Sequence, residues 1–188
     1  LGRLLTDADA DELRDTRNAQ LATFVLSMLI LDAVERLGVD SAGHAGHSLG
    51  EYSALAASGA LDFADAVALV AERGTAMGAA IEESPGTMAA VLGLEDEQVE
   101  TACHEAGDGV WVANYNAPGQ VVVAGTSDAV KAAGQAARGL GAKKVISLEV
   151  AGAFHTPLMA PARERLARAI DGTEIRIPEG TVVANVDA

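Results

Sequence analysis

The segment between Pro85 and Val150 alternates strand-like and helix-like patterns in an order that few folds accommodate. Short apolar runs that favour strands cover residues 87–94, 110–117, 120–126 and 143–150. Helix-like segments cover residues 95–107 and 127–141, the second with Ser127 or Asp128 as its N-cap. Strand, helix, strand, strand, helix, strand is the ferredoxin-like order. We therefore predict a ferredoxin-like subdomain over residues 86–150.

The flanking residues, 1–85 and 151–188, are predicted to form a second, larger α/β subdomain. One helix is expected over residues 16–37, with Asp15 or Thr16 as N-cap and Gly38 as its stop. Another is expected from about Phe63 to Glu82, where apolar residues recur at intervals of four and three.

The C-terminal part of this larger subdomain is predicted to hold a helix and a strand. Thr156 and Pro157 match the N-cap and first helical position, and Gly172 marks the end of that helix. An apolar run over residues 181–186 is typical of a strand. The chain starts abruptly and ends on this strand, so we expect that it lacks N- and C-terminal parts of the full fold.

Composition excludes several classes of protein. The formal net charge is −14, which argues against a general binder of nucleic acid or of anionic membranes. Cys103 is the single cysteine, so no disulfide framework exists and a reducing, cytoplasmic compartment is expected. Within its helical pattern, Cys103 is interpreted as an inert buried thiol.

The longest apolar run extends from Leu21 to Leu31. It is too short to span a bilayer, and the charged residues before it do not resemble the start of a signal peptide. We expect a helix that is buried on all sides and no association with a membrane.

The stretch from Gly43 to Leu55, GHAGHSLGEYSAL, contains Gly46-x-Ser48-x-Gly50 between a short apolar strand and a helix-like run. This is the nucleophile-elbow pattern, in which glycines allow a sharp turn that exposes the serine hydroxyl. The N-terminus of the following helix supplies N–H groups and a positive dipole end where an oxyanion would form. The pattern also occurs in plain strand-to-helix turns, so by itself it leaves both interpretations open.

A serine nucleophile needs a base, and the chain has four histidines. His44 and His47 flank the elbow, but strand geometry points them differently from Ser48. His104 lies among acidic residues in a predicted helix and is interpreted as a solvated surface residue. His155 follows a glycine-rich loop and precedes a helix N-terminus, whose dipole lowers an imidazole's pKa and keeps it ready to accept a proton. A loop histidine without a role is the alternative.

Arg73 falls at the margin of the apolar stripe on the helix over residues 63–82. It is either a side chain that extends its charge to solvent along apolar neighbours or a guanidinium held in a dry cleft for a carboxylate.

Four motifs occur together and in a fixed order: GHSLGEYSAL, then AERG, NYNAPGQVVVAG and GAFHTPLM. Over nearly its whole length the chain thereby resembles the malonyl-CoA:acyl-carrier-protein transacylases of fatty-acid synthesis and the related acyltransferase domains of polyketide synthases. The resemblance implies an α/β-hydrolase-like larger subdomain with a parallel sheet, carrying the ferredoxin-like subdomain as an insert. It also implies an acyltransferase that needs no cofactor of its own.

Site residues follow from the resemblance position by position. Ser48 is similar to the acylated nucleophile and His155 to its base, while Leu49 would supply an oxyanion N–H. Arg73 would hold the free carboxylate of the malonyl group. The further substrate contacts implied are His47, Asn116 and Phe154, and the last fills the space of an α-methyl branch, which favours malonyl over methylmalonyl. No metal is implied.

The sequence also departs from the family pattern. The N-terminal GQGSQ loop, which would supply the second oxyanion donor, is absent, and so are the late glutamine and the GPG turn. The segment NAQLAT stands where the family usually has a Gln-Pro pair.

The partners implied are malonyl-CoA and an acyl carrier protein, with the chain acting as a monomer or as part of a larger synthase. We expect the face that docks the acidic carrier to lie in the last third of the chain, and the alternative is that the basic residues there form solvated helix faces. These basic residues are Lys131, Arg138, Lys143, Lys144, Arg163, Arg165, Arg168 and Arg176. Two other functions stay open at this point, a serine esterase or thioesterase and an inactive truncated scaffold.

Overall fold

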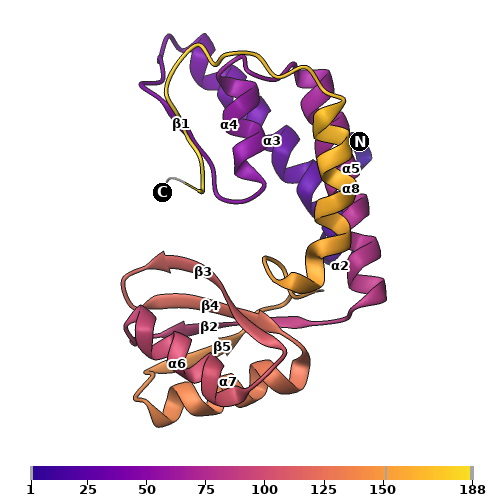
Figure 1. Cartoon of the computed structure of the whole chain (residues 1–188). Helices are drawn as coiled ribbons and strands as arrows, with labels where there is room; N and C mark the ends of the chain where they lie inside the picture. The colour runs from indigo at the N-terminus through magenta and orange to yellow at the C-terminus, as the bar shows by residue number, and fades with distance from the viewer. Residues whose placement is uncertain (1, 151, 187–188) are drawn as a thin grey trace. The chain divides into compact units, whose positions relative to one another are not determined.

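Residues 2–150 and 152–186 are described by a computed structural model, and they divide into two units (Figure 1). The first unit comprises Leu1–Gly78 and Glu164–Ala188, and the second comprises Ala79–Arg163. The second unit is wider than the predicted segment 86–150, so Phe154 and His155 belong to it and not to the unit that holds Ser48.

The first unit is mainly helical. Its helices and strands, including two helices that cross its boundary, are α1 (Gly2–Thr6), α2 (Ala10–Arg14), α3 (Thr16–Arg36), β1 (His44–Ala45), α4 (Gly50–Ala57), α5 (Phe63–Glu83), α8 (Ala160–Asp171) and β6 (Val182–Val183). Strands β1 and β6 pair in parallel, with His44 opposite Val182 and Ala45 opposite Val183. The predicted strand over residues 181–186 is therefore shorter than expected. Of the two predicted N-caps of α3, Asp15 is the one observed, because its carboxylate accepts the N–H of Arg17 at 2.8 Å.

Helix α3 is not buried on all sides, so that expectation was wrong for the described chain. Its buried residues are Gln20, Phe24 and Val25, whereas Leu29 and Ile30 are 55% and 56% exposed. The helix packs one stripe against the core and leaves its other apolar face uncovered. By length and composition α3 could also cross a membrane, a test that core helices of soluble proteins pass as well.

The core of the first unit is built around Phe24, which is fully buried. Its ring stacks on that of Phe63, with centroids 5.8 Å apart, and Leu69 and Val70 of α5 complete the cluster. A two-point ion pair between Arg165 and Glu72 joins α8 to α5, so the packing of α5 is fixed on two sides.

The second unit has the predicted ferredoxin-like arrangement. Its elements are β2 (Thr87–Leu92), α6 (Asp96–Ala106), β3 (Val110–Ala117), β4 (Gln120–Gly125), α7 (Ser127–Gly139), β5 (Lys144–Ser147) and the 3₁₀ turn η1 (Pro157–Met159). The four strands form an antiparallel sheet in the order β3-β4-β2-β5. Both α6 and α7 cover one face of this sheet (Figure 1).

The second face of the sheet is also buried. On β2, Ala89 and Val91 face the two helices, while Met88 and Ala90 face a cluster that includes Ala153. Because both faces are covered, β2 shows a continuous apolar run and not an alternating one. The segment that carries the candidate base therefore rests on the sheet itself.

Several element boundaries of the second unit differ from the prediction, among them the start of α7 and the end of β5. The N-cap of α7 is Thr126 and neither Ser127 nor Asp128, because Thr126 is the extended residue after β4 and its hydroxyl accepts the Ala129 N–H at 3.4 Å. Strand β5 pairs with β2 only over residues 144–147, so the predicted strand was too long at its C-terminal end.

Truncation of Phe24 should destabilise the protein far more than truncation of an exposed residue on the same helix. We expect Phe24→Ala to lower the free energy of unfolding by about 3–5 kcal/mol, because it empties the centre of the core. The control Leu29→Ala should change it by no more than about 0.5 kcal/mol. Urea denaturation of the two variants measures the difference, and similar losses would contradict the described packing.

The single cysteine lies in the core between α6 and the sheet. Cys103 is buried, as predicted, and packs with Val99 and Ala102 of α6. Burial, with a further contribution from the Glu100 carboxylate, raises the pKa of the Cys103 thiol to about 11. The thiol is therefore protonated at neutral pH.

Modification of Cys103 should be slow at pH 8 and accelerate as the pH approaches 11. Only the thiolate reacts, and a free cysteine has a pKa of about 8.5, so the folded protein should react with a disulfide reagent about 10²-fold more slowly than the unfolded chain. The same protein in guanidinium chloride is the control. Rapid reaction of the folded protein at pH 8 would show that the thiol is neither buried nor protonated.

Candidate functional site

The turn at Ser48 has the geometry of a nucleophile elbow. Ser48 has a φ of 54°, which is unfavourable for a residue with a side chain. A Cβ on Gly46 would lie 2.0 Å from the carbonyl carbon and oxygen of Gly50, so only glycine fits there. The Gly50 N–H donates to the His47 carbonyl at 2.9 Å, and α4 begins at once. The predicted strand, turn and helix are thus all present.

Arg73 reaches the elbow from α5. Its Nη2 donates to the Ser48 Oγ at 2.9 Å, its Nη1 donates to the Gln20 Oε1, and its guanidinium carbon lies 5.9 Å from the centroid of the Tyr52 ring. Burial lowers the pKa of Arg73, while Tyr52 and Glu51 act in the opposite direction. An arginine remains protonated nonetheless. A fixed positive charge therefore lies beside the hydroxyl, and the side chain does not extend to solvent.

Gln20 holds the far side of the Arg73 guanidinium. This side chain is only 7% exposed, and its Nε2 donates to the Thr16 Oγ1 at 2.8 Å and lies 3.3 Å from the Met77 Sδ. Helices α3 and α5 approach closely here, because a Cβ on Gly74 would lie 2.9 Å from the Arg17 Cα. The amide oxygen of Gln20 is thereby turned toward Arg73.

The residues on either side of Ser48 differ in their surroundings. Leu49 is the N-cap of α4, and its side chain packs against the core of the first unit. The Leu49 amide makes no hydrogen bond with any residue that the structure describes. His47 is exposed at the same turn.

His155 belongs to the second unit and also has an unfavourable backbone. Its φ is 60°, and among the described residues only Ser48 shares a positive φ without being glycine. Thr156 closes the loop, since its hydroxyl donates to the buried Ala153 carbonyl at 2.7 Å and accepts the Leu158 N–H at 3.3 Å. Such conformations cost about 1–3 kcal/mol and cluster at functional sites.

The other predicted site residues of the second unit lie on and against its sheet. Phe154 is partly buried on the second face of the sheet. Asn116 is exposed on β3, at an irregularity where the pairing with β4 skips from Tyr115 to Ala117. His104 is exposed in the last turn of α6, in agreement with its interpretation as a solvated residue.

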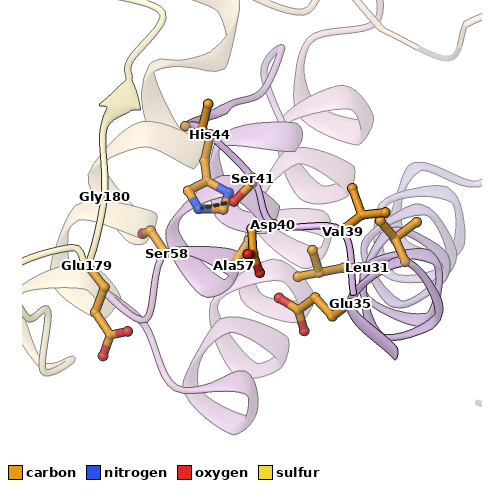
Figure 2. Close-up of a pocket in the computed structure, with 13 residues that line it drawn as sticks. Leu31, Glu35, Val39, Asp40, Ser41, His44, Ala57, Ser58, Glu179 and Gly180 are labelled. Atoms are coloured by element: carbon orange, nitrogen blue, oxygen red, sulfur yellow. Dashed lines mark hydrogen bonds between the residues drawn. The ribbon is translucent and has the colours of Figure 1, made fainter. Parts of the chain in front are cut away.

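A cavity of about 340 Å³ lies elsewhere in the first unit, between the C-terminal end of α3 and β1 (Figure 2). Figure 2 shows His44 inside it, with Nε2 3.2 Å from the Ser41 Oγ. The carboxylates of Glu35, Asp40 and Glu179 also line it. None of the predicted site residues lines this cavity. Among the described residues, no three His, Cys, Asp or Glu side chains lie close enough together to hold a metal ion.

The structure brings Ser48 and Arg73 together in the first unit and places His155, Phe154 and Asn116 in the second. The approach of His155 to Ser48 stays a prediction. Three further residues, none of them among the predicted site residues, contact the elbow or its arginine: Gln20, Tyr52 and Asn185. A glutamine on the buried stripe of an apolar helix was the one available signal for Gln20.

Comparison with known proteins gives one consistent result. A family model described as "Acyl transferase domain" matches residues 1–185. The malonyl CoA-acyl carrier protein transacylase of Bacillus subtilis is 44% identical over 100% of this chain and 60% of its own length, and that of Escherichia coli K12 is 43% identical over 100% and 62%. The chain thus spans about 60% of the length of these curated relatives.

Solved structures agree with this result. A type II polyketide synthase acyl carrier protein in complex with its malonyl-transacylase contains a chain that is 39% identical, with a TM-score of 0.94 over 99% of this chain and 61% of that one. The acyl carrier protein S-malonyltransferase of Vibrio cholerae is 41% identical, with a TM-score of 0.92 over 98% and 61%. This chain belongs to the acyl transferase domain family.

Proposed function

We propose that the protein transfers a malonyl group from malonyl-CoA to the phosphopantetheine thiol of an acyl carrier protein through an ester on Ser48. The observation that carries the proposal is the hydrogen bond of 2.9 Å from the Arg73 guanidinium to the Ser48 Oγ. The relatives from Bacillus subtilis and Escherichia coli, which are named malonyl CoA-acyl carrier protein transacylases, support the same substrate and acceptor.

The position of Arg73 favours a short acyl group that ends in a carboxylate. In a malonyl ester, the free carboxylate is separated from Oγ by one carbonyl and one methylene, so it stays near any group that contacts Oγ. Arg73 presents N–H donors in the fork geometry that matches a carboxylate. A neutral acyl chain would leave a half-buried guanidinium without its anionic partner, which costs about 1–3 kcal/mol.

In the first half-reaction, His155 takes the proton of Ser48 while Oγ attacks the thioester carbonyl of malonyl-CoA. The negative charge that develops on the carbonyl oxygen is stabilised by the N–H of Leu49, which has no partner among the described residues. The C–S bond then breaks, and coenzyme A leaves with the proton that His155 returns. The product is malonyl-Ser48.

In the second half-reaction, the phosphopantetheine thiol of the carrier protein attacks the Ser48 ester. His155 accepts the thiol proton and returns it to Oγ as the ester C–O bond breaks. The strained backbones of Ser48 and His155 support these paired roles, because unfavourable conformations persist where a side chain must be held in one direction.

Three residues beside the machinery are proposed to contact the acyl group. Phe154 restricts the space where an α-methyl branch would lie, which favours malonyl over methylmalonyl. His47 adjoins the nucleophile, and Asn116 lies at the irregular part of β3, where side chains leave the regular ladder.

Incubation with labelled malonyl-CoA should leave a malonyl group on Ser48. We expect a stoichiometric adduct that persists until carrier protein is added, because a transferase, unlike a hydrolase, does not release the acyl group rapidly to water. Mass mapping of a proteolytic digest locates the adduct. Ser48→Ala should abolish it.

Arg73→Leu serves as the matched test of substrate class. We expect it to slow acylation by malonyl-CoA by about 10²-fold, because a buried charge pair loses one partner, and to leave acylation by acetyl-CoA unchanged or faster. In the unmodified protein, rapid release of the acyl group to water would instead identify a hydrolase. An adduct on a residue other than Ser48 would exclude the proposed mechanism.

The carrier protein is proposed to dock on the side of the second unit formed by α7 and β5. Residues 127–147 carry four basic side chains and one acidic side chain, whereas residues 95–108, around α6, carry six acidic side chains and no lysine or arginine. Lys143 and Lys144 are exposed at the start of β5. Lys131 and Arg138 border a cavity of about 250 Å³ between α7 and strands β2 and β5. Thus an acidic partner is attracted to one side of the unit.

Reversal of the charge on this side should weaken the use of the carrier protein. We expect Lys131→Glu, Lys143→Glu and Lys144→Glu combined to raise the KM for the carrier at least about 10-fold at low salt, less at high salt, with the KM for malonyl-CoA unchanged. Arg36→Glu, an exposed reversal on α3, is the control. An unchanged carrier KM in the triple variant would exclude this docking face.

A further inference from the structure

Asn185, which follows β6, contacts the elbow at three points. Its Nδ2 donates to the Gly46 carbonyl at 2.7 Å, and its Oδ1 accepts the Ser48 N–H at 2.7 Å. Its own backbone N–H donates to the Glu51 Oε1 at 2.7 Å. One residue thereby joins the end of β1, the turn and the first turn of α4.

These contacts fix the peptide group between His47 and Ser48 on both of its edges. The His47 carbonyl accepts the Gly50 N–H at 2.9 Å, and the Ser48 N–H donates to Asn185. Rotation about φ of Ser48 turns this peptide relative to the serine side chain. With both edges held, the φ of 54° is maintained although it is unfavourable.

The position of Asn185 follows from the pairing of β6 with β1. Val183 lies opposite Ala45 in the parallel ladder, so Asn185, two residues later, comes level with the elbow. There the regular ladder has ended, since β1 and β6 each extend for only two residues. The side-chain amide of Asn185 supplies a carbonyl and an N–H where a third rung of backbone pairing would otherwise stand.

We propose that Asn185 is a positioning residue that holds Ser48 in its strained conformation and so directs the Oγ to the reacting carbonyl. The inference rests on the proposed function, in which Ser48 is the nucleophile. Asn185 acts through the backbone of the turn, whereas Arg73 contacts the Ser48 Oγ directly. Loss of the Asn185 side chain lets the turn relax toward a negative φ, which moves Oγ away from Arg73.

This role affects the chemical step more than substrate binding. Misplacement of a reacting group by about 1 Å can cost about 10²-fold in rate. The proposed carboxylate site on Arg73 keeps Gln20 and Tyr52, which contact the guanidinium directly and not through the backbone of the turn. Substrate affinity should therefore be preserved when the side chain of Asn185 is removed.

The test compares single-turnover acylation by labelled malonyl-CoA in four forms of the protein. Asn185→Ala should acylate Ser48 about 10²-fold more slowly than the parent, with the KM for malonyl-CoA unchanged within about threefold. Asn18→Ala is the control, because Asn18 also donates to a main-chain oxygen, that of Glu12 at 3.0 Å, far along the chain from the elbow. Asn18→Ala should acylate at the parent rate.

The fourth form, Ser48→Ala, separates the two proposals. If Ser48→Ala is acylated as the parent is, the proposed function fails. If Ser48→Ala is inert and Asn185→Ala reacts at the parent rate, or raises only KM, the role of Asn185 fails alone.

A second pair of variants tests the inference without altering Asn185. Glu51→Ala removes the acceptor of the Asn185 backbone N–H and should slow acylation less than Asn185→Ala does, again without a change in KM. Glu51→Gln keeps an acceptor oxygen and should restore most of the rate. Equal rates in the parent, Glu51→Ala and Glu51→Gln would overturn the inference even if Asn185→Ala failed to fold.

Discussion

A guanidinium held beside a serine hydroxyl organises the first unit. Arg73 cannot lose its charge, so its half-buried position requires partners, and each comes from a different element: Gln20 from α3, Tyr52 from α4 and Ser48 from the turn before α4. The close approach of α3 to α5 at Gly74 makes this convergence possible. The packing of α3, α4 and α5 therefore determines which groups surround Arg73 and Ser48.

Most of the fold could be predicted from the sequence where the hydrophobic periodicity and the capping and turn residues indicate the same element. Both faces of β2 are covered, which agrees with the continuous apolar run of this strand. Helix α3 was placed correctly by Asp15 and Gly38, but its burial was not, because an apolar composition does not reveal how many neighbours a helix has. The N-cap of α7 is Thr126 because β4 ends at the residue before it. Hydrophobic periodicity does not define the end of a strand to within one residue.

In the candidate site, features marked by a local sequence pattern could be predicted, whereas features that depend on residues distant in the sequence could not. The glycines around Ser48 predict a sharp turn, and the structure contains that turn, with Gly46 at a position where a Cβ would clash with Gly50. Arg73 could be placed at the edge of an apolar stripe, yet its direction depends on Gln20, which is distant in sequence. No local sequence pattern marks Asn185, because its proposed role comes from a parallel pairing between two strands that are far apart in the sequence. Long-range register is the information that a single sequence conceals.

Under the proposed role of Phe154, the second face of the ferredoxin-like sheet affects how selectivity for the acyl group can evolve. Phe154 packs in the same cluster as Met88, Ala90 and Val122, which are buried in the strands of the sheet. A change of volume beneath the loop would shift the aromatic ring without replacing it. If Phe154 restricts the acyl group as proposed, exchanges inside the sheet would alter which acyl groups fit while Phe154 itself stayed the same.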